Sequence, residues 1–212
     1  MTIEEIKLKI QSTKSADRRR AAKEIGKTKC TKLAEVIYQA YISELRDKRT
    51  WETQVEMILA LGLINHKEAL KEIEEIVRIN ISHDMITYAA AQTYVRLKRK
   101  SLNDATPSIE LLKFGGLSTV AVCLNPLGYD RMLPNDEQIK ELIKISWDLH
   151  KHKDIIGEEY GYCDPRYGLV AACAGWNKQL TNEFLLHCID TGDVPVKYVA
   201  ENSIKSKYIK LR

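Results

Sequence analysis

Apolar positions recur three and four residues apart along most of the chain, with polar residues between them. In the segment 31–47, for example, Leu33, Ile37, Ala40 and Tyr41 fall at this spacing. The spacing matches the 3.6-residue turn of an α-helix, and it differs from the two-residue alternation of a half-buried strand. The pattern therefore predicts an all-α protein.

The predicted helices come in pairs, and the pairs repeat. Before residue 115 the expected helices span residues 2–12, 15–26, 31–47, 50–62, 67–81, 83–97 and 106–114. Thr2 and Glu5 have the spacing of a capping box at the first helix. Gly26 and Gly62 occupy matching positions and set a period of about 36 residues, within the range typical of α-solenoids.

The centre of the chain departs from this repeat. Gly115-Gly116 and then Asn125-Pro126 interrupt the apolar pattern, so a long loop between helices is expected up to about Pro134. Helices resume in the segments 135–149, 164–176, 180–189 and 193–204. The prediction is a single domain over residues 1–212 with an irregular centre near residues 115–134.

Composition and charge add limits on location and partners. The 212 residues carry a net charge of +4 from 33 basic and 29 acidic side chains, a balance that permits nucleic acid binding without favouring it. Five cysteines without a CxxC pair, and an acidic stretch after Met1, favour a reducing, cytoplasmic location without a signal peptide. The sequence contains no apolar run of about 18 residues, so we expect no membrane partner.

Three segments of the chain resemble HEAT repeats: residues 17–26, 54–65 and 164–176. The matching residues are Asp17, Arg18, Ala21, Ala22 and Gly26, and then Asp164, Arg166, Ala171, Ala172 and Gly175. The resemblance implies a right-handed α-solenoid of about five helical hairpins, armadillo-like, whose concave face is available for binding.

The same resemblance implies a function in protein binding, as an adaptor or as an inhibitor or immunity-type protein. A minority of HEAT-like proteins bind DNA, and one class of alkylpurine DNA glycosylases has this architecture. The sequence matches no catalytic motif of that class, so we assign no catalytic residue and expect no enzyme activity. The sequence does not indicate the oligomeric state.

Aromatic and arginine side chains near residue 165 are the candidates for contact with a protein partner. They are Tyr160, Tyr162 and Arg166, with Arg131 from the irregular centre as a further candidate. Such residues are enriched at binding hot spots. Burial of this aromatic cluster between the last hairpins, including Tyr167 and Trp176, is an equal alternative.

Clusters of basic residues define the alternative function, nucleic acid binding. The candidates are Arg18, Arg19, Lys98, Arg99 and Lys100. If the helix ends align along one edge, these side chains would follow a phosphate backbone. The competing explanation is that lysine and arginine favour helix C-termini, where they complement the helix dipole.

Two combinations of histidine and cysteine in the sequence have residue types that bind metals or act as nucleophiles. His150 and His152 with Cys163 suggest a zinc site. However, side chains two positions apart on a helix point to different faces, so the two histidines would not converge on one ion. We therefore predict no metal and no cofactor. Cys188 follows His187 and continues an apolar stripe, which indicates a core residue and not a nucleophile.

Overall fold

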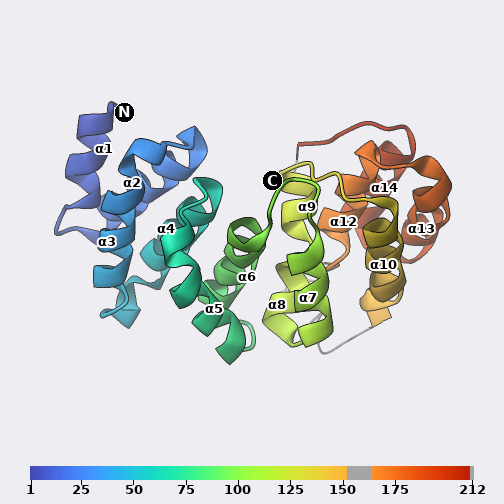
Figure 1. Ribbon diagram of the computed structural model, residues 1–212, viewed down its shortest axis with the longest axis horizontal. Coiled ribbons are helices and arrows are strands. Elements are labelled where there is room, and N and C mark those ends of the chain that lie inside the picture. The colour runs from blue at the N-terminus through green and yellow to red at the C-terminus, as the bar shows by residue number, and fades with distance from the viewer. Residues whose placement is uncertain (152–163, 211–212) are drawn as a thin grey trace. The chain divides into compact units, whose positions relative to one another are not determined.

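The computed structural model describes residues 1–151 and 164–210, and these residues are helical or lie in the turns between helices (Figure 1). No β-strand occurs in these two ranges, so the prediction of an all-α protein is confirmed. The chain divides into two compact units, Met1–Lys98 and Arg99–Arg212, which are described separately below. The right-handed solenoid of five hairpins and the single domain stay predictions.

The first unit is built from α-helices joined by short 3₁₀ turns. Its elements are α1 (Ile3–Ile10), α2 (Ser15–Thr28), η1 (Thr31–Leu33), α3 (Ala34–Glu44), η2 (Lys48–Thr50), α4 (Trp51–Leu63), η3 (Lys67–Ala69), α5 (Leu70–Ile79) and α6 (Met85–Lys98). Helices α2, α4 and α6 pack side by side in this order, while α3 packs on α4 and α5 packs on α6 (Figure 1). The predicted capping box is present, since Glu5 N donates to Thr2 Oγ1 and Thr2 N donates to Glu5 Oε2.

The repeated glycines explain why these helices approach closely. A Cβ atom at Gly26 would lie 3.3 Å from the Cα atom of Ala60 in α4. A Cβ atom at Gly62 would lie 3.1 Å from the Cα atom of Thr93 in α6. The period seen in the sequence therefore marks the crossing points of successive first helices, where the absence of a side chain brings two backbones together.

The second unit is also helical wherever the structure describes it. Its elements are α7 (Thr106–Phe114), α8 (Leu117–Val122), α9 (Asn125–Tyr129), α10 (Asp136–Ser146), η4 (Leu149–Lys151), α12 (Tyr167–Ala172), η5 (Cys173–Gly175), α13 (Lys178–Thr191) and α14 (Val194–Ile204). Helix α12 packs on both α9 and α14, and α13 packs on α14. The indole nitrogen of Trp176 donates to the carbonyl oxygen of Met132 at 2.8 Å, which ties the end of η5 to the segment after α9.

The loop expected between residues 115 and 134 is a correction to the sequence prediction. The segment contains two short helices, α8 and α9, in place of an extended loop. Pro126 lies in the first turn of α9, where backbone N–H groups have no partner within the helix. The N–H that proline lacks is therefore not needed there, so this proline starts a helix and does not break one.

Across the described residues, no helix has both the length and the apolar character needed to span a membrane.

Candidate binding surfaces

The first unit carries an apolar groove where α3 and α5 end and α4 and α6 begin. Its volume is about 390 Å³. The lining residues are Leu45, Lys48, Trp51, Gln54, Ile76, Ile79, Ile81, Asp84, Ile86 and Thr87. We call it the Trp51 groove.

Four large apolar side chains of the Trp51 groove are exposed to solvent. The exposed fractions are 39% for Leu45, 45% for Trp51, 59% for Ile79 and 57% for Ile81. Single exposed apolar residues are normal on protein surfaces, whereas several that share one groove mark a site of interaction. The Trp51 groove is therefore the candidate surface for a protein partner.

The backbone around the groove is fixed by buried polar contacts. The amide of Gln54, which is buried, donates to the carbonyl oxygens of Glu44 at 3.1 Å and Asp47 at 3.0 Å, and so satisfies acceptors left at the end of α3. Trp51 is the first residue of α4, directly after this turn. At the other wall, Asn80 adopts a left-handed conformation with φ 49° and ends α5.

The charged side chains that line the groove are Lys48 and Asp84. The carboxylate of Asp84 caps α6, because it accepts from the backbone N and from Oγ1 of Thr87, both at 2.8 Å. Its charge is thus engaged with the helix terminus, whereas the ammonium group of Lys48 is exposed at the rim. The N-terminal ends of α4 and α6 add partial positive charge at this groove, while the C-terminal ends of α3 and α5 add partial negative charge, so the helix dipoles largely offset each other there.

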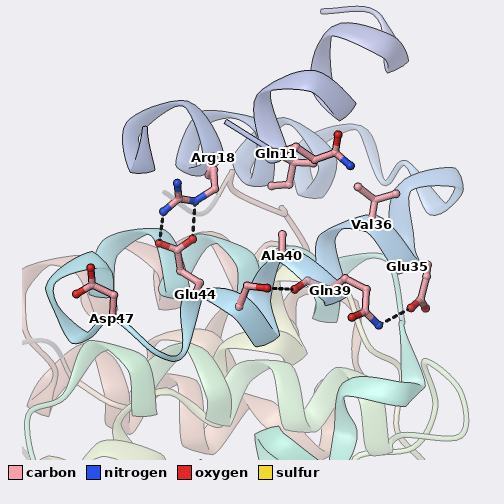
Figure 2. Close-up of a pocket in the computed structure, with 10 residues that line it drawn as sticks. Gln11, Arg18, Glu35, Val36, Gln39, Ala40, Glu44 and Asp47 are labelled. Carbon is pink, nitrogen blue, oxygen red and sulfur yellow. Dashed lines mark hydrogen bonds and ion pairs between the residues drawn. The ribbon is translucent and has the colours of Figure 1, made fainter. Parts of the chain in front are cut away.

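A larger pocket of about 590 Å³ lies between α1, α2 and α3 (Figure 2). Arg18 and Glu44 form its wall through two hydrogen bonds of 2.6 and 2.7 Å, and the hydrogen bond to Glu44 raises the pKa of Arg18. Arg18 also donates to the carbonyl oxygen of Ser12 at 2.8 Å. These contacts fix the start of α2 against α3.

The polar side chains of this pocket form hydrogen bonds with one another and with the backbone. Figure 2 shows Glu35, Gln39 and Asp47 along its edge, and the Gln39 amide donates to Glu35 at 2.7 Å. The hydroxyl of Ser43 donates to the carbonyl oxygen of Gln39, and the lining residues include neither histidine nor cysteine to activate it. The hydrogen bond from Arg49 holds the pKa of Asp47 at about 2, so this carboxylate is ionised at neutral pH.

Most of the basic residues considered for nucleic acid are engaged with carboxylates. The described ion pairs are Arg18 with Glu44, Arg19 with Glu52, Lys98 with Glu74 and Arg99 with Asp130. Lys100 is exposed. To contact a phosphate backbone, the four paired side chains would have to break ion pairs that they form within their own units.

The residues considered for a protein partner are in different environments. Arg166 is fully buried and forms an ion pair with Asp164 at 2.6 Å, so its expected place on a binding surface is corrected to a place in the core. Trp176 is buried as well, in agreement with the packing alternative. The guanidinium carbon of Arg131 lies 4.6 Å from the centre of the Tyr208 ring.

Some candidates from the sequence lie outside the described residues. These are Tyr160, Tyr162, His152 and Cys163.

A polar cluster in the second unit was missed from the sequence. Asp148, His150 and His187 each offer one possible ligand atom, and these atoms all lie within 4.8 Å of one another. Burial is the main cause that lowers the pKa of His150. The sequence prediction grouped His150 with His152, two residues away. Nothing in the sequence shows that α13 brings His187 close to His150.

Cys188, which follows His187 in the sequence, is fully buried, as predicted. Burial raises the pKa of its thiol to about 12, so the thiolate needed for nucleophilic attack is scarce at neutral pH. Burial also raises the pKa values of Cys123 and Cys173. These three cysteines act as small apolar core residues.

Comparison of the chain with protein-family models, curated proteins and solved structures gives no match.

Proposed function

We propose that this chain is a non-enzymatic protein-binding module, of the adaptor or inhibitor type, and that the Trp51 groove binds an amphipathic, acidic segment of its partner. The observation that carries the proposal is the grouping of Leu45, Trp51, Ile79 and Ile81, all exposed, around one groove. A peptide helix would insert apolar side chains at helical spacing into such a groove.

The size of the apolar contribution supports this choice of surface. Burying one large apolar side chain contributes about 1.5–3 kcal/mol. Two or three anchors in the groove would thus contribute about 3–9 kcal/mol before the costs of association and ordering are subtracted. Trp51 is the expected hot spot, since tryptophan is enriched among residues that dominate binding energy.

The acidic character of the ligand follows from the charges at the rim. Lys48 offers an exposed cation, while the carboxylate of Asp84 is occupied as a helix cap. Acidic side chains flanking the apolar anchors would be attracted to this rim, whereas lysine-flanked anchors would be repelled.

A displayed library of random 16-residue peptides tests the proposal, with the native chain as bait. The selection should enrich acidic peptides with apolar residues at helical spacing. The tightest peptide, labelled with a fluorophore, should lose at least tenfold in affinity for Trp51→Ala, because the main anchor pocket is removed. Tyr198→Ala is the matched control, since Tyr198 is an aromatic residue with 59% exposure in the second unit.

Two results would contradict the proposal. One is a selected peptide that binds Trp51→Ala as tightly as it binds the native chain. The other is binding of a 20-base-pair DNA duplex that weakens steeply with salt in proportion to the phosphates contacted, which would favour the nucleic acid alternative. In that case Arg19→Ala and Lys100→Ala should reduce the duplex affinity while Trp51→Ala leaves it unchanged.

A further inference from the structure

We propose that Asp148, His150 and His187 form a binding site for one divalent transition-metal ion, with Zn²⁺ as the best-fitting ion. Two imidazoles and one carboxylate are a ligand set found in zinc sites. One ligand atom from each residue already lies within 4.8 Å of the other two. The site is in the second unit and is independent of the Trp51 groove.

The distances are compatible with a small adjustment on binding. Bonds of about 2.0–2.2 Å in a tetrahedral zinc site place two ligand atoms about 3.3–3.6 Å apart. The three ligand atoms therefore need to approach by roughly 1.5 Å at most. Asp148 is exposed, so rotation of its side chain provides part of this movement without disturbing the core.

His187 is oriented in the way that ligating histidines are held in proteins. Its Nε2 atom lies 3.1 Å from the carbonyl oxygen of Trp147, and its ring stacks on the Trp147 ring at 4.5 Å between centres and 11° between planes. A carbonyl oxygen only accepts, so Nε2 carries the proton and the lone pair is on Nδ1. This arrangement fixes the ring and leaves one nitrogen for a metal ion.

His150 supplies a second, independent indication of a ligand. Its Nδ1 atom is buried and has no hydrogen-bond partner among the described residues. The ring lies edge-on to His187, with ring centres 5.4 Å apart. A buried nitrogen without a partner is costly, and coordination to a metal ion would satisfy it.

The present contacts of Asp148 are weak enough to be replaced. Its carboxylate pairs with Lys151 at 2.7 Å, and both side chains are exposed. Such surface pairs contribute at most about 1 kcal/mol, so a metal ion displaces Lys151 at low cost. The buried charges nearby are balanced, because Arg166, whose Nη1 lies 3.5 Å from the Trp147 carbonyl oxygen, is paired with Asp164.

Titration of the purified chain with ZnCl₂, followed by isothermal calorimetry, tests the site. We expect saturable binding of one Zn²⁺ per chain, and visible absorption of a tetrahedral complex when CoCl₂ replaces ZnCl₂. Asp148→Asn should weaken binding at least tenfold while circular dichroism stays unchanged, since Asp148 lies on the surface. His150→Ala and His187→Ala should abolish binding, and His83→Asn, an exposed histidine of the first unit, should leave it unchanged.

The proposal is overturned if the native chain shows no saturable Zn²⁺ binding. It is also overturned if Asp148→Asn and His150→Ala, both folded by circular dichroism, bind Zn²⁺ as the native chain does. Peptide binding at the Trp51 groove is measured in a separate experiment. A negative result for one proposed site therefore does not affect the test of the other.

Discussion

Asp164 and Arg166 form an ion pair from which solvent is excluded, and it organises one region of the second unit. Arg166 donates to both carboxylate oxygens of Asp164 and also to Oγ1 of Thr191 at 3.1 Å. The backbone N–H of Asp164 donates to Asp193, which also caps α14 at Val196. The pair thus links the start of α12 to the end of α13 and the start of α14.

Replacing Arg166 by methionine should be strongly destabilising. The change leaves the Asp164 carboxylate buried without its partner, which lowers the free energy of unfolding by about 3–5 kcal/mol. The double variant Asp164→Asn, Arg166→Met removes the stranded charge and should recover part of the loss. Urea unfolding followed by circular dichroism measures both, and a loss below about 1 kcal/mol for the single variant would contradict this account.

At the residue scale, helix starts could be predicted from the sequence, whereas the burial of individual side chains could not. Asp164 and Pro165 indicated the start of a helix, and a helix, α12, does begin shortly afterwards at Tyr167. Whether Arg166 faces solvent depends on its packing against α13 and α14. The residues next to Arg166 in the sequence do not indicate this packing. For the same reason Trp51 drew no attention, because an aromatic residue at a helix start is covered or exposed according to its neighbours in space.

The helices approach one another most closely at glycines. At Gly168 in α12, a Cβ atom would lie 2.4 Å from the carbonyl oxygen of Leu124 and 2.5 Å from the Cα atom of Asn125. Both are backbone atoms at the start of α9, which cannot rotate away as a side chain can. Any side chain at residue 168 therefore separates α12 from α9.

The variant Gly168→Ala should lower the free energy of unfolding by about 1–3 kcal/mol, because overpacking outweighs the better helix propensity of alanine. Gly26→Ala provides a matched change in a helix of the first unit, where the nearest atom is the end of the Leu63 side chain at 3.1 Å and the nearest backbone atom, the Cα atom of Ala60, is 3.3 Å away. Its effect should be smaller. Thermal unfolding of the two variants compares them, and equal or reversed effects would refute the backbone argument.

At the scale of elements, most helices could be predicted from apolar spacing and caps. The segment 115–134 could not, because Gly115-Gly116 and Asn125-Pro126 resemble loop signals whether or not a short helix follows. Helices α8 and α9 have only 6 and 5 residues. Elements that short carry too few apolar positions to show a period, and they are stabilised by packing, as α9 is by α12.

Over the whole molecule, the division into two compact units was not visible in the sequence. The boundary falls between Lys98 and Arg99, inside the basic run Lys98-Arg99-Lys100. Within the first unit, α6 packs on α4 and α5. This arrangement makes the first unit a candidate for independent folding.

The isolated segment Met1–Lys98 should therefore remain folded, and it should bind a peptide selected for the Trp51 groove with the affinity of the full chain. Its core and the whole groove lie within these residues. Helical circular dichroism with a cooperative thermal transition is the expected result. A fragment without cooperative unfolding would show that the first unit depends on the rest of the chain.

The bond from Trp176 to Met132 has a consequence for the order of folding. It joins residues 44 positions apart in the chain, somewhat farther apart than the contacts between α4 and α6 in the first unit, such as Thr93 with Ile58, which are 35 positions apart. Contacts between distant residues form slowly, because a long stretch of chain must first be closed into a loop. During synthesis on the ribosome, residues 1–98 can complete their helical stack early, whereas residues near Met132 must wait until Trp176 has emerged.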